Sequence, residues 1–421
     1  MEEATISVRL EKLAIYWLQV PLLIAVFCTP SKSRVLAAEK QSFAAWKQQL
    51  RADAIIFGIR PSVFDRATND VRPNYKLPDL VRSPSQKRRP KGQAEFVRPP
   101  QAYLSKKLLT NLAQRGRQLL SRHAAALGQI EREIGVAPAA VLAIWGRETA
   151  FGGYRLRHNA IRTLVTQAYA GRRSRVFRRE LFHALQLIQS GIANDQRLRS
   201  SWAGAIGLTQ FMPSEYDSLA YDLNRDGFKD IWSPEEALAS AANQLRSKGW
   251  QSGKTWGFEV TLSNQVTCAM DGPRDARTIR DWQKLGVSRT GSRQFPKRYS
   301  DEVAFLFTPG GGLGPAFLVL ENFMVFKRYN PSDLYTLFVG HLADRILGGG
   351  DFVSDWSSIR QLPTAEIESI QSHLKAEGFN ISKVDGKVGA NTRSQIGRYQ
   401  RRHGLKIDCW PSARLLQHMR G

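Results

Sequence analysis

Apolar residues recur at helical spacing through most of the chain. Between residues 41 and 67 they stand three or four positions apart, which predicts an amphipathic helix, and Ser62 is expected to cap a second short turn. A longer stripe predicts one long helix that Gly135 ends. Pro138 then starts a shorter helix that ends at Gly152, and the short loop between the two predicts an antiparallel pair. The stripe consists of Leu109, Leu112, Leu119, Leu120, Leu127, Ile130 and Ile134.

Further helices and a small sheet follow from the same reasoning. Helical spacing covers residues 160–170, 178–189, 234–248 and 334–346. After Trp256 the pattern changes to short apolar runs at residues 258–262, 303–307 and 316–320, and such runs predict strands. Gly310 to Gly314 lacks the Gly-Lys-Ser/Thr of a phosphate-binding loop and predicts a hairpin turn. The predicted fold class is mainly α, of the α+β type.

Two stretches without helical spacing divide the chain. Gly348 to Gly350 separates the helix before it from a compact three-helix pattern that begins at Ile359. Residues 71–100 are rich in Pro, Lys, Arg and Ser, and they predict an extended, solvated connection. Its basic run, Lys87 to Lys91, is either a patch that binds a wall or a nucleic acid, or a solvated strap, and we favour the strap.

The charge of the chain is strongly positive. Its 421 residues carry 61 Lys and Arg against 37 Asp and Glu, a formal net charge of +24. This length exceeds the usual single core, so we expect more than one domain. The charge predicts attraction to a polyanion or an anionic surface, including a membrane surface. Nucleic acid and a bacterial wall rich in carboxylates are both candidates, and charge alone does not choose between them.

The N-terminus carries an apolar run, residues 13–28, that is shorter than the ~20 residues of a membrane span. Arg9 and Lys12 precede it, and Ala37 or Ala38 offers a small-residue cleavage site, so residues 1–38 are predicted to be a signal peptide that directs the protein to the periplasm. The alternative is an uncleaved anchor. Lipidation of Cys28 is disfavoured because bulky Phe27 precedes it. Two further cysteines remain, Cys268 and Cys409, and whether they form a disulfide is left open by the sequence.

One acid stands out as a candidate catalytic residue. Glu148 leaves the predicted helix from Pro138 on the same apolar face as Ile144, with Val141 and Trp145 beside it. Desolvation there would raise the pKa of the carboxyl group and let it hold a proton near neutral pH. The alternative is a buried ion pair with Arg147 or Arg155.

The second candidate stretch, residues 201–214, mixes small residues with one amide. Gly204 and Gly207 would let the backbone approach a ligand closely, and Gln210 offers both a donor and an acceptor. A third stretch copies the first half of an EF-hand loop, with Asp222, Asn224 and Asp226 at alternate positions before Gly227. Ser233 stands where the loop's late acid should be, so either a lengthened metal loop or a turn without metal is expected.

The two motifs Gly-x-Glu148-Thr-x-Phe-Gly and Gly204-Ala-Ile-Gly-x-x-Gln-Phe-Met-Pro-Ser together resemble lytic murein transglycosylases of the membrane-bound B type. The resemblance extends from Phe43 to Gly349. It implies a lysozyme-like helical catalytic domain with a small β-sheet subdomain, which we assign to residues 39–350. Residues 359–421 resemble a peptidoglycan-binding module, and they depart from it at Cys409, where the module normally has glycine.

The resemblance also implies a reaction and its residues. Glu148 would protonate the glycosidic oxygen of the β-1,4 bond between N-acetylmuramic acid and N-acetylglucosamine. As a carboxylate it would then accept a proton from the sugar's own 6-hydroxyl, giving a 1,6-anhydro end without a catalytic cofactor. Structural calcium would be held by Asp222, Asn224, Asp226, the Phe228 carbonyl and Glu236. The implied substrate-binding residues are Ser201, Gln210, Tyr103, Tyr329 and Asn330.

Gln244 departs from the family, which normally has an aromatic residue at that position. Two other functions stay open: a lysozyme-like hydrolase in which Glu215 or Asp217 is the second carboxylate, and a non-catalytic protein that binds the wall or a nucleic acid. The export signal and the absence of an aromatic and basic recognition motif argue against nucleic acid as the partner. Peptidoglycan strands are the expected partner, and we expect a monomer.

Overall fold

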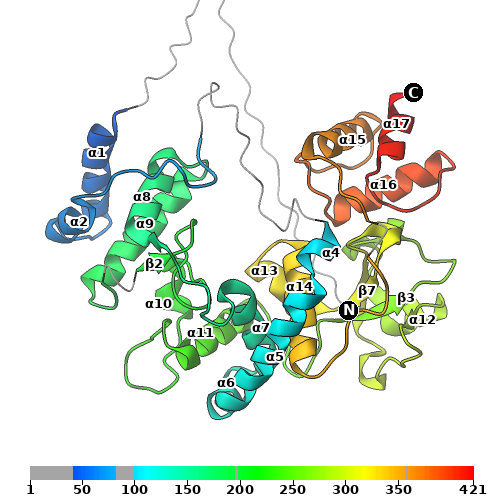
Figure 1. Cartoon of the computed structure of the whole chain (residues 1–421), viewed down its shortest axis with the longest axis horizontal. Helices are drawn as coiled ribbons and strands as arrows, with labels where there is room; N and C mark the ends of the chain where they lie inside the picture. The colour runs from blue at the N-terminus through cyan, green and yellow to red at the C-terminus, as the bar shows by residue number, and fades with distance from the viewer. Residues whose placement is uncertain (1–40, 82–98, 195–197, 357–358) are drawn as a thin grey trace, which may run out of the picture.

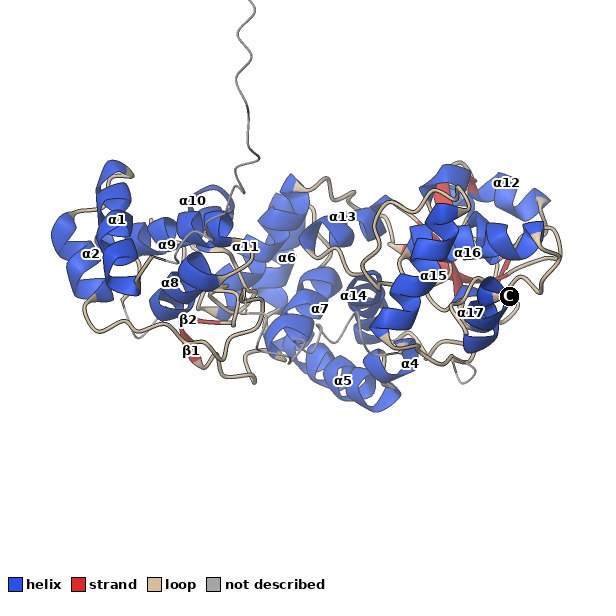
Figure 2. Cartoon of the chain, turned by 90° about the horizontal axis from the view of Figure 1, so that it is seen from above, coloured by secondary structure: helices blue, strands red, loops and turns tan. Residues whose placement is uncertain are grey.

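The structure, a computed structural model, describes residues 41–81, 99–194, 198–356 and 359–421. The predicted signal peptide, residues 1–38, and the basic run Lys87 to Lys91 lie outside these ranges. Within them, no helix is both long and apolar enough to cross a membrane. The elements form a row of three regions in both views: a helical lobe, a central helical region, and a sheet with the C-terminal helices beside it (Figures 1 and 2).

The helical lobe at one end of the row has its own apolar core. Phe64, Phe177, Leu181 and Leu185 are buried there. The helix predicted from residue 178 begins four residues earlier, and the helix predicted for residues 160–170 is confirmed. The lobe contains α1 (Phe43–Ile56), α2 (Pro61–Thr68), α8 (Ala160–Ala170), α9 (Ser174–Gln189) and the two-stranded pair β1 (His158–Asn159) and β2 (Arg199–Ser200).

The central region surrounds α7, whose apolar residues are almost all buried. Here the prediction of one long helix is wrong, because His123 ends α5 and begins α6. The break lets α5 pack on α7 and α14 while α6 packs on α11, which one straight helix would not reach. The region contains α4 (Pro100–Tyr103), α5 (Lys106–Arg122), α6 (Ala124–Ile134), α7 (Pro138–Thr149), α11 (Pro234–Ser247), α13 (Glu321–Tyr329) and α14 (Asp333–Ile346). The short helix α10 (Tyr216–Leu219) contacts α11 but buries Tyr216 in the core of the helical lobe.

The sheet is antiparallel, with strand order β4-β6-β7-β3-β5. All three predicted strands are present, and Gly310 to Gly314 joins β6 to β7 as the predicted hairpin connection. The two edge strands were not predicted because two residues are too short to show a period. The elements are β3 (Gly257–Thr261), β4 (Arg277–Thr278), α12 (Ile279–Lys284), β5 (Ser288–Arg289), β6 (Val303–Phe307) and β7 (Ala316–Val319).

The C-terminal helices pack against the sheet region and are cross-linked to it. They are α15 (Thr364–Ala376), α16 (Ala390–Arg402) and α17 (Ala413–Arg420), as the three-helix pattern predicts. Cys268 and Cys409 form a disulfide, which settles the question that the sequence left open. Cys409 has φ +54°, a backbone region that favours glycine. This explains why the resembling peptidoglycan-binding module normally has glycine at this position. In this chain the disulfide accompanies a strained backbone conformation at Cys409.

A buried ion network also joins the C-terminal helices to α14. Arg393 of α16 is 1% exposed, and it donates to Asp271 (2.7 Å), to Asp333 (3.1 Å) and to the Val388 carbonyl (2.8 Å). Lys327 also bonds Asp333, at 2.6 Å. Burial alone would raise the pKa of Asp333, but Lys327 and Arg393 hold it below its usual range. The first turn of α14 is therefore fixed by a residue of the C-terminal helices.

Two buried titratable groups lie near the other end of α14. Burial raises the pKa of Asp344 to about 7, although Trp256 donates its indole N–H to this carboxyl group. Burial lowers the pKa of His341 to about 3, and the imidazole stacks on Phe352 with ring centroids 3.7 Å apart. The two groups have opposite effects on stability as the pH changes.

Replacement of Asp344 by Asn is expected to make the protein relatively more stable as the pH rises from 4 to 7. The native state of the wild type keeps this proton where the unfolded state has lost it, so Asp344 reduces stability over that range by at most about 4 kcal/mol. His341 acts oppositely, because the unfolded state binds a proton as the pH falls below 6.5. Urea unfolding of the wild type and of Asp344→Asn at pH 4.5, 6 and 8 measures how the difference in stability between them changes with pH.

The matched control for this measurement is Asp301→Asn, at a carboxyl group whose side chain is 78% exposed. The control is expected to follow the wild type at every pH. A constant difference in stability between Asp344→Asn and the wild type would contradict the assigned pKa shift.

Candidate active site

Glu148 lies in the last turn of α7 and is half-buried. Pro138 occupies the first turn of this helix, and Ala150 and Phe151 end it with φ values of +49° and +57°. These are left-handed conformations, which are uncommon for residues with a side chain. The Tyr335 hydroxyl donates to Glu148 Oε1 at 2.5 Å. The carboxyl group is thus held by a neutral donor at the end of a buried helix.

Arg147 and Arg155 were the predicted alternative partners of Glu148. The Arg147 guanidinium donates to the Tyr103 hydroxyl and lies over the Tyr103 ring, 4.7 Å from its centroid. Arg155 is exposed. Arg147 is therefore engaged with Tyr103, and the ion-pair alternative for Glu148 stays a prediction.

Two tyrosines share the surroundings of Glu148. Burial, followed by the charge of Glu148, raises the pKa of both Tyr329 and Tyr335 well above 10. Both hydroxyl groups therefore keep their protons and act as donors. Tyr335 was missed from the sequence, because a tyrosine on the buried face of a helix has the same pattern whether it packs or holds an acid.

The loop of residues 201–214 lies against the Glu148 helix. Thr149 donates its hydroxyl to the Leu208 carbonyl at 2.8 Å, and the Tyr329 hydroxyl donates to the Thr209 carbonyl at 2.5 Å. These two bonds bring the loop beside both Glu148 and Tyr329. Gln210 follows with φ +62°, and its side-chain amide donates to the Gly207 carbonyl at 3.1 Å.

The two glycines of this loop serve packing. Gly204 and Gly207 have φ values of +86° and +71°. A Cβ atom on Gly204 would lie 2.3 Å from the Leu164 side chain, and one on Gly207 would lie 2.8 Å from the Ile231 carbonyl oxygen. The close approach that the sequence indicated is therefore made to the protein's own core.

The other predicted substrate residues have structural contacts of their own. Ser201 Oγ accepts from the Ala205 N–H at 3.3 Å, and Asn330 Oδ1 accepts from the Ser332 N–H at 3.1 Å. Tyr103 is only 5% exposed. The roles of these residues toward a sugar stay predictions.

A second carboxylate, on Glu215, acts electrostatically on this group. Its charge contributes to the raised pKa of Tyr329, after burial and Glu148. Gln244, at the position where the resemblance predicts an aromatic residue, donates to Glu215 at 3.0 Å and so holds this second acid. Asp217, the other candidate second carboxylate, is exposed.

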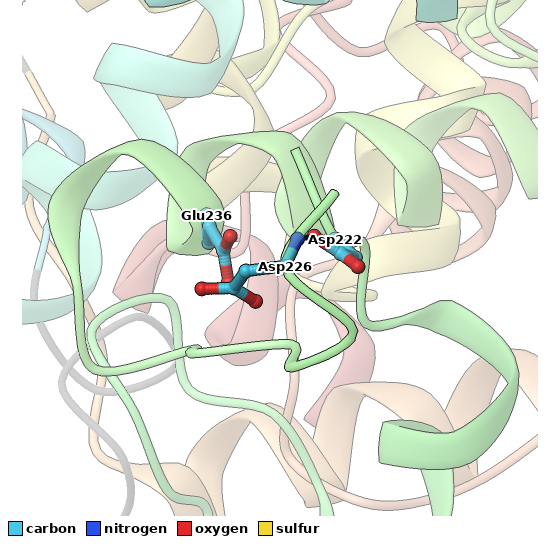
Figure 3. Close-up of side chains that lie close together, drawn as sticks. All are labelled: Asp222, Asp226 and Glu236. Carbon is cyan, nitrogen blue, oxygen red and sulfur yellow. Dashed lines mark hydrogen bonds between the residues drawn. The ribbon is translucent and has the colours of Figure 1, made fainter. Parts of the chain in front are cut away.

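The predicted metal loop gathers three carboxylates. Oxygen atoms of Asp222, Asp226 and Glu236 lie within 4.8 Å of one another. Figure 3 shows Glu236 reaching from α11 toward the loop that carries the two aspartates. The loop turns through backbone bonds from Asp226 and Gly227 to Asp222. The Asn224 side chain forms hydrogen bonds with Asp226. Glu236 lies three residues beyond Ser233, which is the position expected of the late acid in a lengthened loop.

The chemistry of this cluster fits a hard cation. Glu236 is 3% exposed, and its Oε1 has no hydrogen-bond partner among the described residues. Burial raises the pKa of Glu236, and the charges of Asp222 and Asp226 add to the rise. A cation with oxygen ligands would satisfy the buried oxygen and offset the repulsion between the three carboxylates.

Residues 42–344 match the transglycosylase SLT domain family. The chain belongs to this family. Residues 363–419 of this SLT transglycosylase match a peptidoglycan binding domain family. It is 27% identical over 245 residues to the membrane-bound lytic murein transglycosylase B of Escherichia coli (strain K12), an alignment that covers 58% of this chain and 66% of that protein, just under two thirds.

The solved structures that resemble this transglycosylase include the following two. SltB3 from Pseudomonas aeruginosa, in complex with NAG-anhNAM-pentapeptide, has a TM-score of 0.82 and 37% identity, and the match covers 90% of this chain and all of that one. Slt35 from Escherichia coli, in complex with calcium, has a TM-score of 0.58 and 23% identity over 72% of this chain and 92% of that one. The second likeness shows the fold alone.

Proposed function

We propose that this transglycosylase cleaves the β-1,4 bond between N-acetylmuramic acid and N-acetylglucosamine in murein and leaves a 1,6-anhydro end. The observation that carries the proposal is the Glu148 carboxyl group, half-buried at the end of α7 and held by the Tyr335 hydroxyl at 2.5 Å. The family match and the similarity to SltB3, whose complex contains an anhydro-muramic ligand, support the same reaction.

Glu148 would act first as an acid and then as a base. Its proton passes to the glycosidic oxygen as the bond between that oxygen and C1 breaks. The resulting carboxylate accepts the proton of the 6-hydroxyl as O6 bonds to C1, so no water is consumed. Since Tyr335 holds Oε1, the other carboxyl oxygen would carry the proton that is transferred.

The residues around Glu148 would position the sugar. Gln210 has a side-chain amide beside the acid's helix, and Tyr329 holds the same loop through Thr209. Within this proposal, Ser201 and Asn330 supply further polar groups. Arg147 covers the Tyr103 ring, so a sugar would reach that ring only if the guanidinium moved.

Replacement of Tyr335 by Phe is expected to lower kcat about 10- to 100-fold and to move the alkaline limb of the pH profile, where Glu148 loses its proton, to higher pH. The hydroxyl group donates to the carboxylate form of Glu148, and a hydrogen bond to a charged group contributes about 1.5–3 kcal/mol. Steady-state turnover of murein between pH 4 and 8 measures both effects.

The matched control is Tyr216→Phe. Tyr216 is also buried, and its hydroxyl donates to the Lys229 carbonyl at 2.7 Å, away from the acid. This variant is expected to keep the wild-type pH profile. The positioning role of Tyr335 would be refuted if both variants lost activity equally with no change in the profile.

The test of the proposed reaction is the mass of the products. Purified murein digested by the enzyme is expected to give muropeptides with anhydro ends, each lighter by one water than the hydrolysed product. Reducing ends in place of anhydro ends would identify a lysozyme-like hydrolase instead. Glu215, whose charge reaches Tyr329, would then be the second carboxylate.

The cellular location of the enzyme follows from the same proposal. Murein lies outside the cytoplasmic membrane, so we propose that residues 1–38 direct export to the periplasm, where the positive charge favours association with the wall and with membrane surfaces. Residues 39–350 would perform catalysis and residues 359–421 would bind peptidoglycan. We propose that the enzyme acts as a monomer.

We also propose that Asp222, Asn224, Asp226, the Phe228 carbonyl and Glu236 hold a structural calcium ion. Glu236 Oε1, which has no hydrogen-bond partner in the part of the chain that the structure describes, and the crowded carboxylates support this site, as does the calcium complex of the related fold. When bound, the ion would neutralise the loop and fix it to α11. Catalysis by Glu148 would not require it.

Addition of calcium is expected to raise the thermal unfolding midpoint of the wild type by several degrees and to leave Glu236→Gln unchanged. An ion that binds only the native state stabilises it by about 2.7 kcal/mol at 100 times its Kd. Glu235→Gln, a change in the adjacent and more exposed carboxyl group, is the control that keeps the calcium response. An equal response in Glu236→Gln would refute the site.

A further inference from the structure

A cavity of about 520 Å³ lies between the sheet, the C-terminal end of α14 and residues 349–353, which lead to the C-terminal helices. Figures 1 and 2 both show α14 between the sheet and α7, the helix that carries Glu148. Asp344, on the cavity wall, lies nine residues beyond Tyr335 along α14, which corresponds to a rise of about 13.5 Å. The cavity is therefore separate from the surroundings of Glu148.

Opposite charges face this cavity without forming an ion pair. Asp344, Arg289 and Arg293 all line it, yet no ion pair joins Asp344 to either arginine within the part of the chain that the structure describes. Burial raises the pKa of Asp344, and the hydrogen bond from Trp256 and the charges of both arginines offset part of the rise. The three groups are thus close enough to interact and too far apart to bond, so a ligand between them can contact all three.

Two polar side chains of the lining lack hydrogen bonds that a ligand would supply. Arg289 donates through Nη1 to the Gln294 carbonyl at 3.0 Å, but its buried Nε has no partner among the described residues. His341 is 5% exposed and stacks on Phe352, and no described residue bonds its ring nitrogens. Buried polar groups are nearly always bonded, so these two indicate that the cavity holds a polar ligand.

The other two acids of the lining are already engaged. Glu259 accepts from the backbone N–H groups of residues 353 and 354, at 3.0 and 2.8 Å. Asp351 forms ion pairs with Lys106 and Arg345. Because these acids have partners in the wall, the two arginines are the charges that remain available to a ligand.

The donors and acceptors of the cavity fit a phosphate group that carries a proton. Arg289 and Arg293 present N–H groups, and the guanidinium fork matches the oxygen geometry of phosphate. Contact between the Asp344 carboxyl group and a ligand oxygen requires one proton between them. Hydrogen phosphate supplies this proton even when Asp344 has lost its own, whereas sulfate and carboxylate ligands do not. The rings of Trp256 and Phe317 provide an apolar wall for an organic substituent.

We infer that this cavity binds a phosphate group that retains a proton, as inorganic phosphate or as a phosphate monoester. The cavity has the volume of about seventeen waters at ~30 Å³ each, which exceeds that of a phosphate group and leaves room for an organic substituent. Because residues 349–353 form one wall, the ligand would join this segment to the sheet. Binding here does not depend on the proposed reaction.

Calorimetric titration of the purified protein at pH 8 and matched ionic strength tests the inference. Inorganic phosphate, glycerol 3-phosphate and sulfate are titrated separately. Asp344 has mostly lost its proton at this pH, so phosphate is expected to bind at least about ten times more tightly than sulfate. Tighter binding of either phosphate ligand supports the site and identifies the form that it prefers.

Two variants and a control locate the binding. Arg289→Gln is expected to weaken phosphate binding at least about tenfold. Arg280→Gln changes an arginine of α12 whose side chain is 58% exposed and pairs with Asp301, and it is expected to bind as the wild type does. Asp344→Asn is expected to bind sulfate more tightly than the wild type, because its amide N–H donates to either anion. A misfolded variant would not show this gain.

Three results would overturn the inference: equal binding of phosphate and sulfate by the wild type, unchanged phosphate binding by Arg289→Gln, or no phosphate binding up to about 10 mM. Glycine is titrated as well, since a zwitterion would place its carboxylate on the arginines and its ammonium on Asp344. Binding of glycine in the absence of phosphate binding would also overturn it. The products of murein digestion bear only on the reaction, so failure of either proposal is recognised separately.

Discussion

Replacement of Glu148 by Gln is expected to lower murein cleavage by at least about 1,000-fold while the fold is retained. General acid–base catalysis contributes typically 10²- to 10⁴-fold, and here one residue would perform both proton transfers. Glutamine has nearly the same shape as glutamate, and its amide oxygen still accepts from the Tyr335 hydroxyl. Turnover of purified murein, with the thermal unfolding midpoint as the check on folding, is the measurement.

The matched control is Glu215→Gln, the same change at the second carboxylate near Tyr329. If Glu148 is the only catalytic acid, this variant keeps anhydro product formation with at most a modest loss. If the enzyme is instead a hydrolase that uses both acids, the two variants would lose activity together. A fully active Glu148→Gln enzyme would refute Glu148 as the catalytic acid, whereas absence of murein cleavage by the wild type itself would favour the non-catalytic wall-binding alternative.

Replacement of Arg393 by Met is expected to lower stability by about 3–5 kcal/mol. The change removes the only guanidinium that bonds both Asp271 and Asp333 in the described chain, and it leaves two buried carboxylates with less compensation. For a domain of this size, each kcal/mol corresponds to about 2–4 °C in the unfolding midpoint, so a fall of roughly 10 °C is predicted. Thermal unfolding followed by calorimetry measures it.

Arg398→Met is the control from the same helix. Arg398 is partly exposed, and its nearest carboxylate, on Asp275, is 3.9 Å away, so the expected cost is below about 1 kcal/mol. The triple change Arg393→Met, Asp271→Asn and Asp333→Asn is expected to recover much of the loss, because it removes the buried charges together. If Arg393→Met and Arg398→Met proved equally mild, the C-terminal helices would not be fixed to α14 by this network.

The sequence predicted those features that have a local signal. Glu148 was identified because helical spacing placed a carboxyl group among apolar residues at the end of a short helix. The metal loop was identified because its acids alternate before a glycine. The strands β6 and β7 were identified because each is a run of four or five apolar residues between turns, and β3 because apolar Phe258 and Val260 alternate with polar residues.

The features that the sequence did not predict depend on contacts between distant residues. Tyr335 is nearly 190 positions from Glu148, and nothing in its own neighbourhood distinguishes it from a packed tyrosine. The break at His123 follows from helices α5 and α6 packing on different partners. Arg393 occurs in an ordinary helical pattern, and only the fold shows that it is buried between Asp271 and Asp333.

The central claim is that the sugar's own 6-hydroxyl, and not water, attacks the bond that Glu148 protonates. Digestion of murein in water enriched in ¹⁸O, followed by mass spectrometry of the newly formed ends, tests it most directly. The account predicts muramic ends that contain no ¹⁸O and lack one water relative to the hydrolysed sugar. Ends that carry one ¹⁸O atom at C1 would contradict it.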